Sequence, residues 1–351
     1  MKDKFTKTEV MTNFFMICSS PFLGIGFYNL VRLSNIDSII SILIALIFSF
    51  ILLYMYIKIN NYNNTLDIFY KIKTLFNSIN YKLITFILSI SFFILSSCMF
   101  YNINSFIITE FFDETYFTII AILLCVLITY ISSKGINTIL KVGNILFYIV
   151  CFILIIEFFG NYNSIDLSNL KPILTSGIIN PIKGSISIIL FNMVYLFLFL
   201  TIPKDKIIKN KNYNLCLIIS NILLFIFFLV TTIYTISVLG INLVTLYEYP
   251  IYMSLRGISI FGFINRIENF IIIYWIFEVF MLLSFTTYFI SKALNIKESV
   301  VTLSLFTFTI LFFKNITFYN VFVSNYLYLF SSIIILIFII ICIRICKKKM
   351  E

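Results

Sequence analysis

Long apolar runs that are almost free of charge constrain the fold of this chain more than any other feature. Residues 38–57, SIISILIALIFSFILLYMYI, contain no charged side chain, and several other segments read in the same way. A helix needs about 20 such residues to cross the hydrocarbon core of a bilayer. Hydrophobic residues make up 61% of the 351 residues and charged residues 11%, whereas soluble domains average about 25% charged. The sequence therefore predicts an all-α polytopic membrane protein.

We predict ten transmembrane helices in a single permease-like domain, 1–351. They lie at roughly 9–30, 38–58, 82–107, 116–132, 139–159, 184–202, 214–238, 267–291, 299–313 and 321–343. With the N-terminus inside, 19 of the 25 basic residues fall in cytoplasmic segments, as the positive-inside rule requires. Both termini are then cytoplasmic. The even count suggests two inverted five-helix repeats, 1–159 and 184–345.

The residue inventory excludes several kinds of chemistry. The chain has no His, which removes Ser-His-Asp triads, HExxH zinc sites and His-ligated haem. Its seven cysteines form no CxxC pair, so the sequence indicates no metal site. There is also no Walker A or GxSxG motif. We expect no enzyme activity, no cofactor, no metal and no nucleic-acid partner.

The first span contains the best candidate for a ligand site. Ser19, Ser20, Pro21, Gly24 and Gly26 fall together near its middle. Pro cannot donate to the helix ladder, and Gly weakens it. Transporters often bind substrate where paired helices unwind at the midplane, because the freed N–H groups suit a carboxylate. The alternative is a kinked helix that packs on small residues.

The sixth span is the expected counterpart of the first, with a weaker central break. Asn192 lies in its middle and Tyr195 follows one turn later, while Pro203 ends the span. Asn192 is a candidate ligand group, and so is Tyr195. The alternative for Asn192 is a hydrogen bond between helices.

Glu278 is the clearest ionisable residue inside a span, and such residues are functional candidates by default. It lies twelve residues after Arg266, about 18 Å along the eighth span. Two interpretations of Glu278 fit the sequence equally well. One is a proton site or an amine-binding group, and the other is a protonated carboxyl that is hydrogen-bonded within the bundle. Glu157 lies near the outer end of span five, where it can reach the interface. Glu110, in the second outer loop, is expected to be solvated.

The segment 249–280 resembles the hallmark region of the spore-germination B-subunit permeases. That region has a Tyr-Pro pair, an Arg, an Arg-x-Glu and a Trp in span eight. The matching residues here are Tyr249, Pro250, Arg256, Arg266, Glu268 and Trp275. Weaker matches precede span six and open span two. They are Pro172, Gly177, Gly184 and Asp37. The chain departs from the family in Asp37-Ser38-Ile39, in SSPFLGIG and in the acid at position 278.

The resemblance implies a function. These permeases belong to the amino acid–polyamine–organocation superfamily and have two inverted five-helix repeats. They are the membrane-embedded B subunits of nutrient receptors in the inner membrane of bacterial endospores, where they partner an A subunit and a lipoprotein C subunit. They sense amino acids or related nutrients. We therefore expect a germinant-sensing subunit that binds a small amino acid between spans 1, 3, 6 and 8.

Two other hypotheses remain open from the sequence. One is a secondary transporter that couples amino-acid uptake to protons through Glu278. The other is a scaffold subunit without a ligand.

Overall fold

The computed structural model describes the backbone of residues 4–112, 114–160, 165–172, 174, 177–208, 212–256, 259–260, 264–265 and 268–348. Side chains are described for the same residues except 156–160 and 257–272. Helices dominate these ranges, so the prediction of an all-α membrane protein is confirmed. The α-helices are α1 (Lys7–Ser19), α2 (Phe27–Ser34), α3 (Ser38–Asn60), α4 (Ile68–Leu75), α5 (Ser78–Phe111), α6 (Phe117–Ser133), α7 (Ile136–Gly160), α8 (Ile179–Phe191), α9 (Tyr213–Leu246), α10 (Pro250–Leu255), α11 (Glu268–Leu294), α12 (Glu298–Phe312), α13 (Ile316–Phe322) and α14 (Tyr328–Lys348).

Other helical forms connect or interrupt these elements. Two are π-helical, η1 (Phe22–Gly26) and η7 (Val323–Leu327). The 3₁₀ segments are η2 (Asn35–Asp37), η4 (Leu167–Leu170), η5 (Met193–Thr201) and η6 (Lys204–Lys206). Two short sheets complete the described chain: β1 (Phe5–Thr6) pairs in parallel with β2 (Ile207–Ile208), and β3 (Ser259–Ile260) pairs antiparallel with β4 (Ile264–Asn265).

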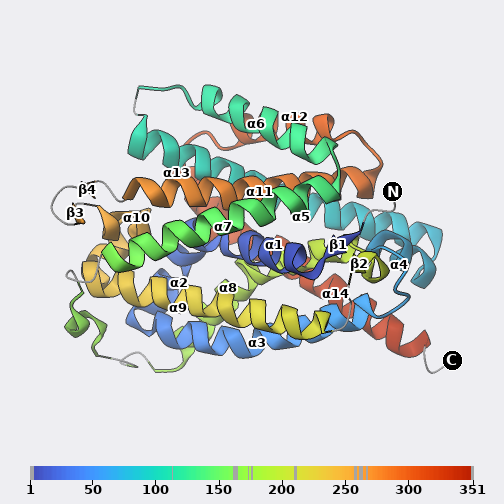
Figure 1. Ribbon diagram of the computed structural model, residues 1–351, viewed down its shortest axis with the longest axis horizontal. Helices are drawn as coiled ribbons and strands as arrows, with labels where there is room; N and C mark the ends of the chain where they lie inside the picture. Colours follow the sequence, from blue (N-terminus) through green and yellow to red (C-terminus); the bar gives the residue numbers. More distant parts are fainter. Residues whose placement is uncertain are drawn as a thin grey trace.

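Seven segments of the described chain are long and apolar enough to cross a membrane, and α6 and α12 are shorter apolar helices. The first segment, 7–60, includes α1, α2 and α3. Asn35 has a φ of +49° between α2 and α3, and both α1 and α3 pack against α9. The chain therefore folds back within this segment, as Figure 1 shows.

The helices run roughly along the long axis of the molecule, with α1 near the middle of the bundle (Figure 1). α1 packs on α7, α9, α11 and η5, while α8 packs on α2 and α3. The outward faces carry apolar side chains. Ile47, Leu123 and Phe152 are 67%, 61% and 65% exposed, as expected for helices that face lipid rather than water.

Local sequence explains where several helices begin. Thr6 and Glu9 form a capping box at α1, in which Thr6 Oγ1 accepts from the Glu9 N–H and the Thr6 N–H donates to Glu9 Oε2. This arrangement satisfies two of the free N–H groups of the first turn. Asp67 caps α4 by accepting from the Tyr70 N–H. In α9, Gly240 has a φ of +71°, a backbone shape that suits Gly, and it lies just beyond the predicted end of span seven.

Candidate functional site

The irregularity predicted in the first span is a π-helical turn. α1 ends at Ser19, and Pro21 precedes η1. The Gly26 N–H donates to the Pro21 carbonyl at 2.7 Å, five residues back instead of four. All five residues of η1 are buried. Single π-turns inside helices occur frequently at functional sites, because they widen the helix and redirect backbone groups.

The sixth span is interrupted more extensively than the sequence indicated. α8 ends at Phe191, and the nine residues of η5 then follow as a 3₁₀-helix. Runs of 3₁₀-helix longer than three or four residues are uncommon and often mark hinges. Asn192 lies at the junction and is fully buried. Its Nδ2 donates to the Ile188 carbonyl at 3.2 Å, and its Oδ1 has no hydrogen-bond partner in the described part of the chain.

The two interrupted helices face each other. A Cβ added at Gly26 would lie 3.1 Å from Asn192 Nδ2, a tight contact, so the two segments approach each other closely at this glycine. Pro21, Ile25 and Tyr195 line a shared cavity of about 10 Å³ together with Leu95 and Met99 of α5. That volume corresponds to about one water molecule. The structure thus shows this site in a nearly closed form.

Helices α5 and α11 close the other side of η1. A Cβ at Gly24 would overlap Asn102 Oδ1 of α5 and lie 2.6 Å from Trp275 Cζ2 of α11. Trp275 is 1% exposed, and its Nε1 donates to the Ser20 carbonyl at 3.0 Å. Helices from both halves of the chain therefore pack around the break in the first span.

Glu278 lies one turn beyond Trp275 and is fully buried. Ser19 Oγ donates to Glu278 Oε1 at 2.6 Å. Glu278 Oε2 has no hydrogen-bond partner among the described residues. The carboxyl therefore contacts the C-terminal end of α1, directly before the break.

All seven residues predicted as ligand-binding lie at or around the break in the first span. Four belong to the break itself: Ser19, Ser20, Gly24 and Gly26. The other three lie against it: Asn192, Tyr195 and Glu278. Sequence reasoning missed Asn102, which also contacts the break and is 4% exposed. Its Oδ1 has no partner in the described chain.

Two of the motif residues, Tyr249 and Trp275, form an aromatic cluster with Phe106 of α5. The Tyr249 ring lies 4.7 Å from Phe106 and 5.9 Å from Trp275 between centroids. Tyr249 Oη also donates to the Asn102 carbonyl at 3.5 Å. Pro250 occupies the first position of α10, where its missing N–H is tolerated. The Tyr-Pro pair therefore starts the short helix that covers Trp275.

Other motif residues stabilise the loops. Asp37 Oδ1 accepts from the Leu174 N–H at 2.6 Å, which ties the start of α3 to the segment before α8. Gly177 in that segment has a φ of +73°, the region that favours Gly. Pro172 lies in the same segment. Gly184 of α8 packs closely on Ser34 and Ser41.

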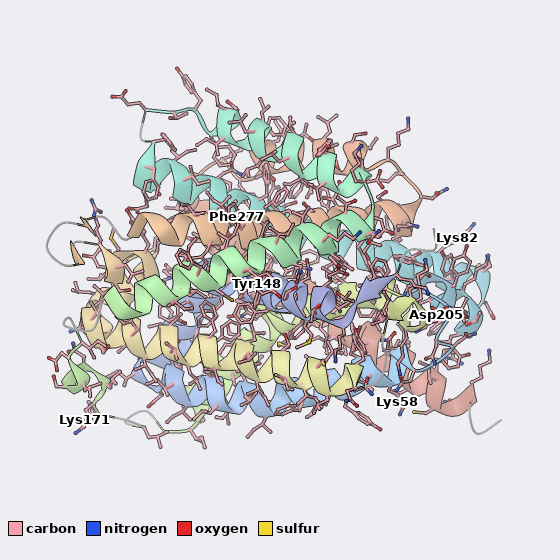
Figure 2. The ribbon with its side chains drawn as sticks, in the orientation of Figure 1. Lys58, Lys82, Tyr148, Lys171, Asp205 and Phe277 are labelled. Carbon is pink, nitrogen blue, oxygen red and sulfur yellow. The ribbon has the colours of Figure 1, made fainter. Side chains whose placement is uncertain are left out.

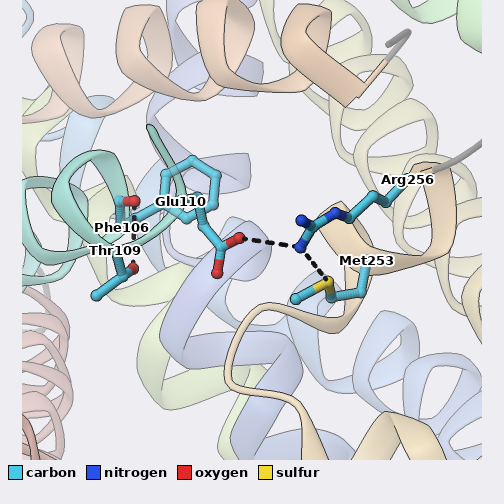
Figure 3. A network of polar contacts seen from close by, with 5 residues as sticks. All are labelled: Phe106, Thr109, Glu110, Met253 and Arg256. Atoms are coloured by element: carbon cyan, nitrogen blue, oxygen red, sulfur yellow. Dashed lines mark hydrogen bonds and ion pairs between the residues drawn. The ribbon is translucent and has the colours of Figure 1, made fainter. Parts of the chain in front are cut away.

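Arg256 follows α10 and pairs with Glu110 at 3.9 Å, as Figure 3 shows. Its NH1 group also lies 3.9 Å from Met253 Sδ. The expectation that Glu110 is solvated is corrected, because its side chain is only 14% exposed. Arg266 and the side chains of Glu268 and Glu157 lie outside the described residues.

Sequence comparison assigns the family. A family profile described as spore germination protein matches residues 7–350, nearly the whole chain. The chain belongs to the spore germination protein family.

This member of the family is also similar to a characterised protein. It is 24% identical over 229 residues to spore germination protein A2 of Bacillus subtilis (strain 168). The match covers 63% of this chain and 62% of that protein, so it spans less than two thirds of the relative's length.

In this member of the family, a second cavity lies beside Gly24 of η1. Its lining includes Gly24 and Asn102, together with Arg32, Glu248 and Asn320. Sequence reasoning selected neither Arg32 nor Glu248 as a candidate residue. Burial raises the pKa of the Glu248 carboxyl, and a hydrogen bond from Asn320 opposes this effect. Within the described ranges, no three His, Cys, Asp or Glu side chains form a metal-binding cluster.

Proposed function

We propose that this chain is the membrane-embedded B subunit of a nutrient germinant receptor in the inner membrane of bacterial spores. In this proposal it senses a small amino acid, which binds between spans 1, 3, 6 and 8. The observation that carries the proposal is the meeting of two interrupted helices at Gly26 and Asn192. Interrupted helices expose backbone N–H and carbonyl groups that recognise the charged groups of an amino acid.

The topology that we propose has ten spans in two inverted five-helix repeats. The folded-back segment 7–60 supplies two passes, the other six long segments supply one each, and α6 and α12 supply two more. Lys58 and Lys82 lie at the end of the molecule that carries both termini, and Lys171 lies at the opposite end (Figure 2). This distribution supports cytoplasmic termini, because basic loops stay inside.

We place the chain in a complex with an A subunit and a lipoprotein C subunit, as its family resemblance implies. Ligand binding would favour one arrangement of the bundle over another, and the partners would respond to that shift. A ligand can shift such an equilibrium only by its difference in affinity for the two states. The nearly closed cavity beside Tyr195 supports two states, because a ligand must enlarge it in order to bind.

Nutrient response in spores tests the proposal. Gly24→Val and Gly26→Val would fill the approach to the backbone, and we expect both to abolish the response while the protein is still detected in spore membranes. Ile47→Val serves as the control, because the Ile47 side chain is 67% exposed and lies outside the break. A normal response in both valine variants would refute the site.

A proton-coupled amino-acid transporter is the second candidate, and the Ser19–Glu278 contact favours it. A buried carboxyl with one oxygen free can take up and release a proton during a transport cycle. Glu278→Gln should then remove the pH dependence of amino-acid uptake into vesicles that contain the purified chain. Uptake that keeps its pH dependence would exclude Glu278 as the coupling group, and the absence of both uptake and ligand binding would favour a scaffold role.

A further inference from the structure

A groove of about 540 Å³ lies on the surface between the first turns of α5 and the last turn of α11. Most of its lining is apolar, and the exposed side chains in it include Ile79, Leu83, Phe86 and Leu294. Ligand sites in proteins measure about 300–1,000 Å³. The groove is therefore large enough to seat a ligand, whereas the two cavities beside the break in the first span hold about one or two water molecules.

The apolar side chains of α5 form a stripe along one face of the helix. Ile79, Leu83, Phe86 and Ile90 follow one another at intervals of four, three and four residues, and all four are exposed. That spacing places them on the same face. Thr85 in the lining is 4% exposed, and its Oγ1 donates to the Tyr81 carbonyl within the helix. The stripe therefore offers an occupant a continuous apolar track.

Lys82 places a positive charge in the same groove. It is exposed, and it has no ion-pair partner in the described ranges, where the one ion pair joins Arg256 to Glu110. The side chains of a helix lean toward its N-terminus. For Lys82 this direction leads to the end of the molecule that carries both chain ends (Figure 2). The ammonium group therefore lies at the outer end of the apolar stripe.

This end of α5 reaches the level of the lipid headgroups. The helix has 34 residues, about 51 Å at 1.5 Å per residue, and the hydrocarbon core of a bilayer is about 30 Å thick. Part of α5 must therefore extend beyond the hydrocarbon or tilt within it. Lysines near the ends of spanning helices extend their ammonium groups to the interface, so Lys82 marks the first turns as an interfacial end.

Positive charge also adjoins the α11 side of the groove. Lys292 and Lys297 lie on either side of Leu294 in the sequence, and both are exposed. The carboxylate next to Lys297 is that of Glu298, whose Oε1 accepts a hydrogen bond from Ser291 Oγ at 2.9 Å. An occupant of the groove thus meets an apolar track below an end where the exposed charges are basic.

We propose that this groove binds an anionic phospholipid, with its phosphate on Lys82 and an acyl chain along Leu83 and Phe86. A phospholipid presents its phosphate at headgroup level and its chains below, which matches the order of these residues along α5. A helix of another protein would cover the apolar stripe but would leave Lys82 without an anion. The site is independent of the nutrient ligand, because Asn102, which contacts the break, lies 17 residues beyond Thr85, about 25 Å along α5.

The test uses the full chain, purified in a neutral detergent, and measures thermal stabilisation by graded concentrations of short-chain lipids. Dioctanoyl phosphatidylglycerol is the anionic probe, and dioctanoyl phosphatidylcholine is a zwitterionic probe with the same chains. Glycerol phosphate carries the phosphate without the chains. We expect phosphatidylglycerol to stabilise the chain at a concentration at least about fivefold lower than phosphatidylcholine, and glycerol phosphate to have no effect.

Variants of the groove separate the contributions of its charge and its apolar lining. Lys82→Gln should lower the apparent affinity for phosphatidylglycerol about fivefold, the contribution of one lysine near an anionic surface, and Lys82→Arg should retain it. Phe86→Ala should weaken the binding of both lipids. Lys134→Gln and Phe48→Ala are the matched controls, because both side chains are exposed and lie outside the groove. We expect both controls to bind the lipids as the wild type does.

Four results would overturn the proposal. The first is equal stabilisation by the two lipids, and the second is an affinity for phosphatidylglycerol that Lys82→Gln or Phe86→Ala leaves at the level of the controls. The third is stabilisation by glycerol phosphate as strong as by phosphatidylglycerol, which would assign Lys82 to a free anion. The fourth is no stabilisation by either lipid, which would favour a membrane helix of a partner as the occupant of the groove.

Discussion

Replacing Gly24 by Ala tests how tightly the first span is held at its break. The new Cβ would lie 2.6 Å from Trp275 Cζ2 and would overlap Asn102 Oδ1. Trp275 cannot move freely, because it is buried against Phe106 and its Nε1 donates to the Ser20 carbonyl. Overpacking of this kind costs about 1–3 kcal/mol. If the indole hydrogen bond breaks as well, the cost rises by about 1 kcal/mol.

Thermal unfolding in detergent measures this cost. An unfolding entropy of about 2.1 cal/mol/K per residue gives about 0.7 kcal/mol per kelvin for a chain of 351 residues. A loss of 1–3 kcal/mol therefore lowers Tm by about 1.4–4 °C. Phe at position 275 removes the ring atoms nearest to the new methyl group. Gly24→Ala should therefore be less damaging in a Trp275→Phe background, with a coupling free energy of about 1–2 kcal/mol.

Two results would refute this reasoning. A change in Tm below about 0.5 °C for Gly24→Ala would show that the break has room for a methyl group. Strict additivity of the two substitutions would show that the methyl group does not press on the indole. Ile47→Val is the control for the loss of one methyl group outside the break, since Ile47 is 67% exposed, and its Tm should stay unchanged.

Three further predictions concern the loops. Lys71 is buried, which lowers its pKa to about 8, whereas the pKa of an unfolded lysine is about 10.4. Unfolding therefore takes up a proton between about pH 8 and about pH 10.4, so the free energy of unfolding should rise with pH in that window. The Tm difference between wild type and Lys71→Met should change over the same window. A constant difference would contradict the assignment. Asp37→Ala should lower the free energy of unfolding by about 1–3 kcal/mol, because the Leu174 N–H loses its acceptor. Limited proteolysis should also cut the segment before α8 faster in this variant. An unchanged cleavage rate would argue against a stabilising role for the hydrogen bond between Asp37 and Leu174. Arg256→Gln should lower the free energy of unfolding by less than about 1 kcal/mol, because the distance between Arg256 and Glu110 is long and the Arg256 side chain is 60% exposed. A larger loss of stability in thermal unfolding would mean that the ion pair is stronger than its geometry implies.

The break in the first span could be predicted from sequence because Pro21, Gly24 and Gly26 act on their own backbone. Proline lacks an N–H and glycine lacks a side chain, so both effects are local. The interruption after Asn192 was underestimated for the opposite reason. No Pro or Gly lies between Met193 and Thr201, and all nine residues are buried. Tertiary packing therefore sustains the 3₁₀ segment, and local sequence carries no trace of it.

Partners across the bundle were beyond the reach of sequence reasoning. The position of Glu278 along its span gave its depth in the membrane, but not the direction in which it faces Ser19. Asn102 gave no signal, since Asn is abundant throughout the chain. Arg32 and Glu248 lie far apart in the sequence, and only the folded chain brings them to one cavity.

The parallel pairing of β1 with β2 fixes the N-terminal strand to the segment that follows span six. Phe5 and Thr6 pair with Ile207 and Ile208, which follow η6, a short 3₁₀ segment beyond the end of η5. The segments that contain the two interrupted helices are thus in contact twice, at Gly26 and Asn192 and again where β1 pairs with β2. Between these two contacts lies α1, a helix of 13 residues that is about 20 Å long. A shift of η1 relative to η5 would therefore be passed along α1 to the end of the molecule where both chain ends lie (Figure 1).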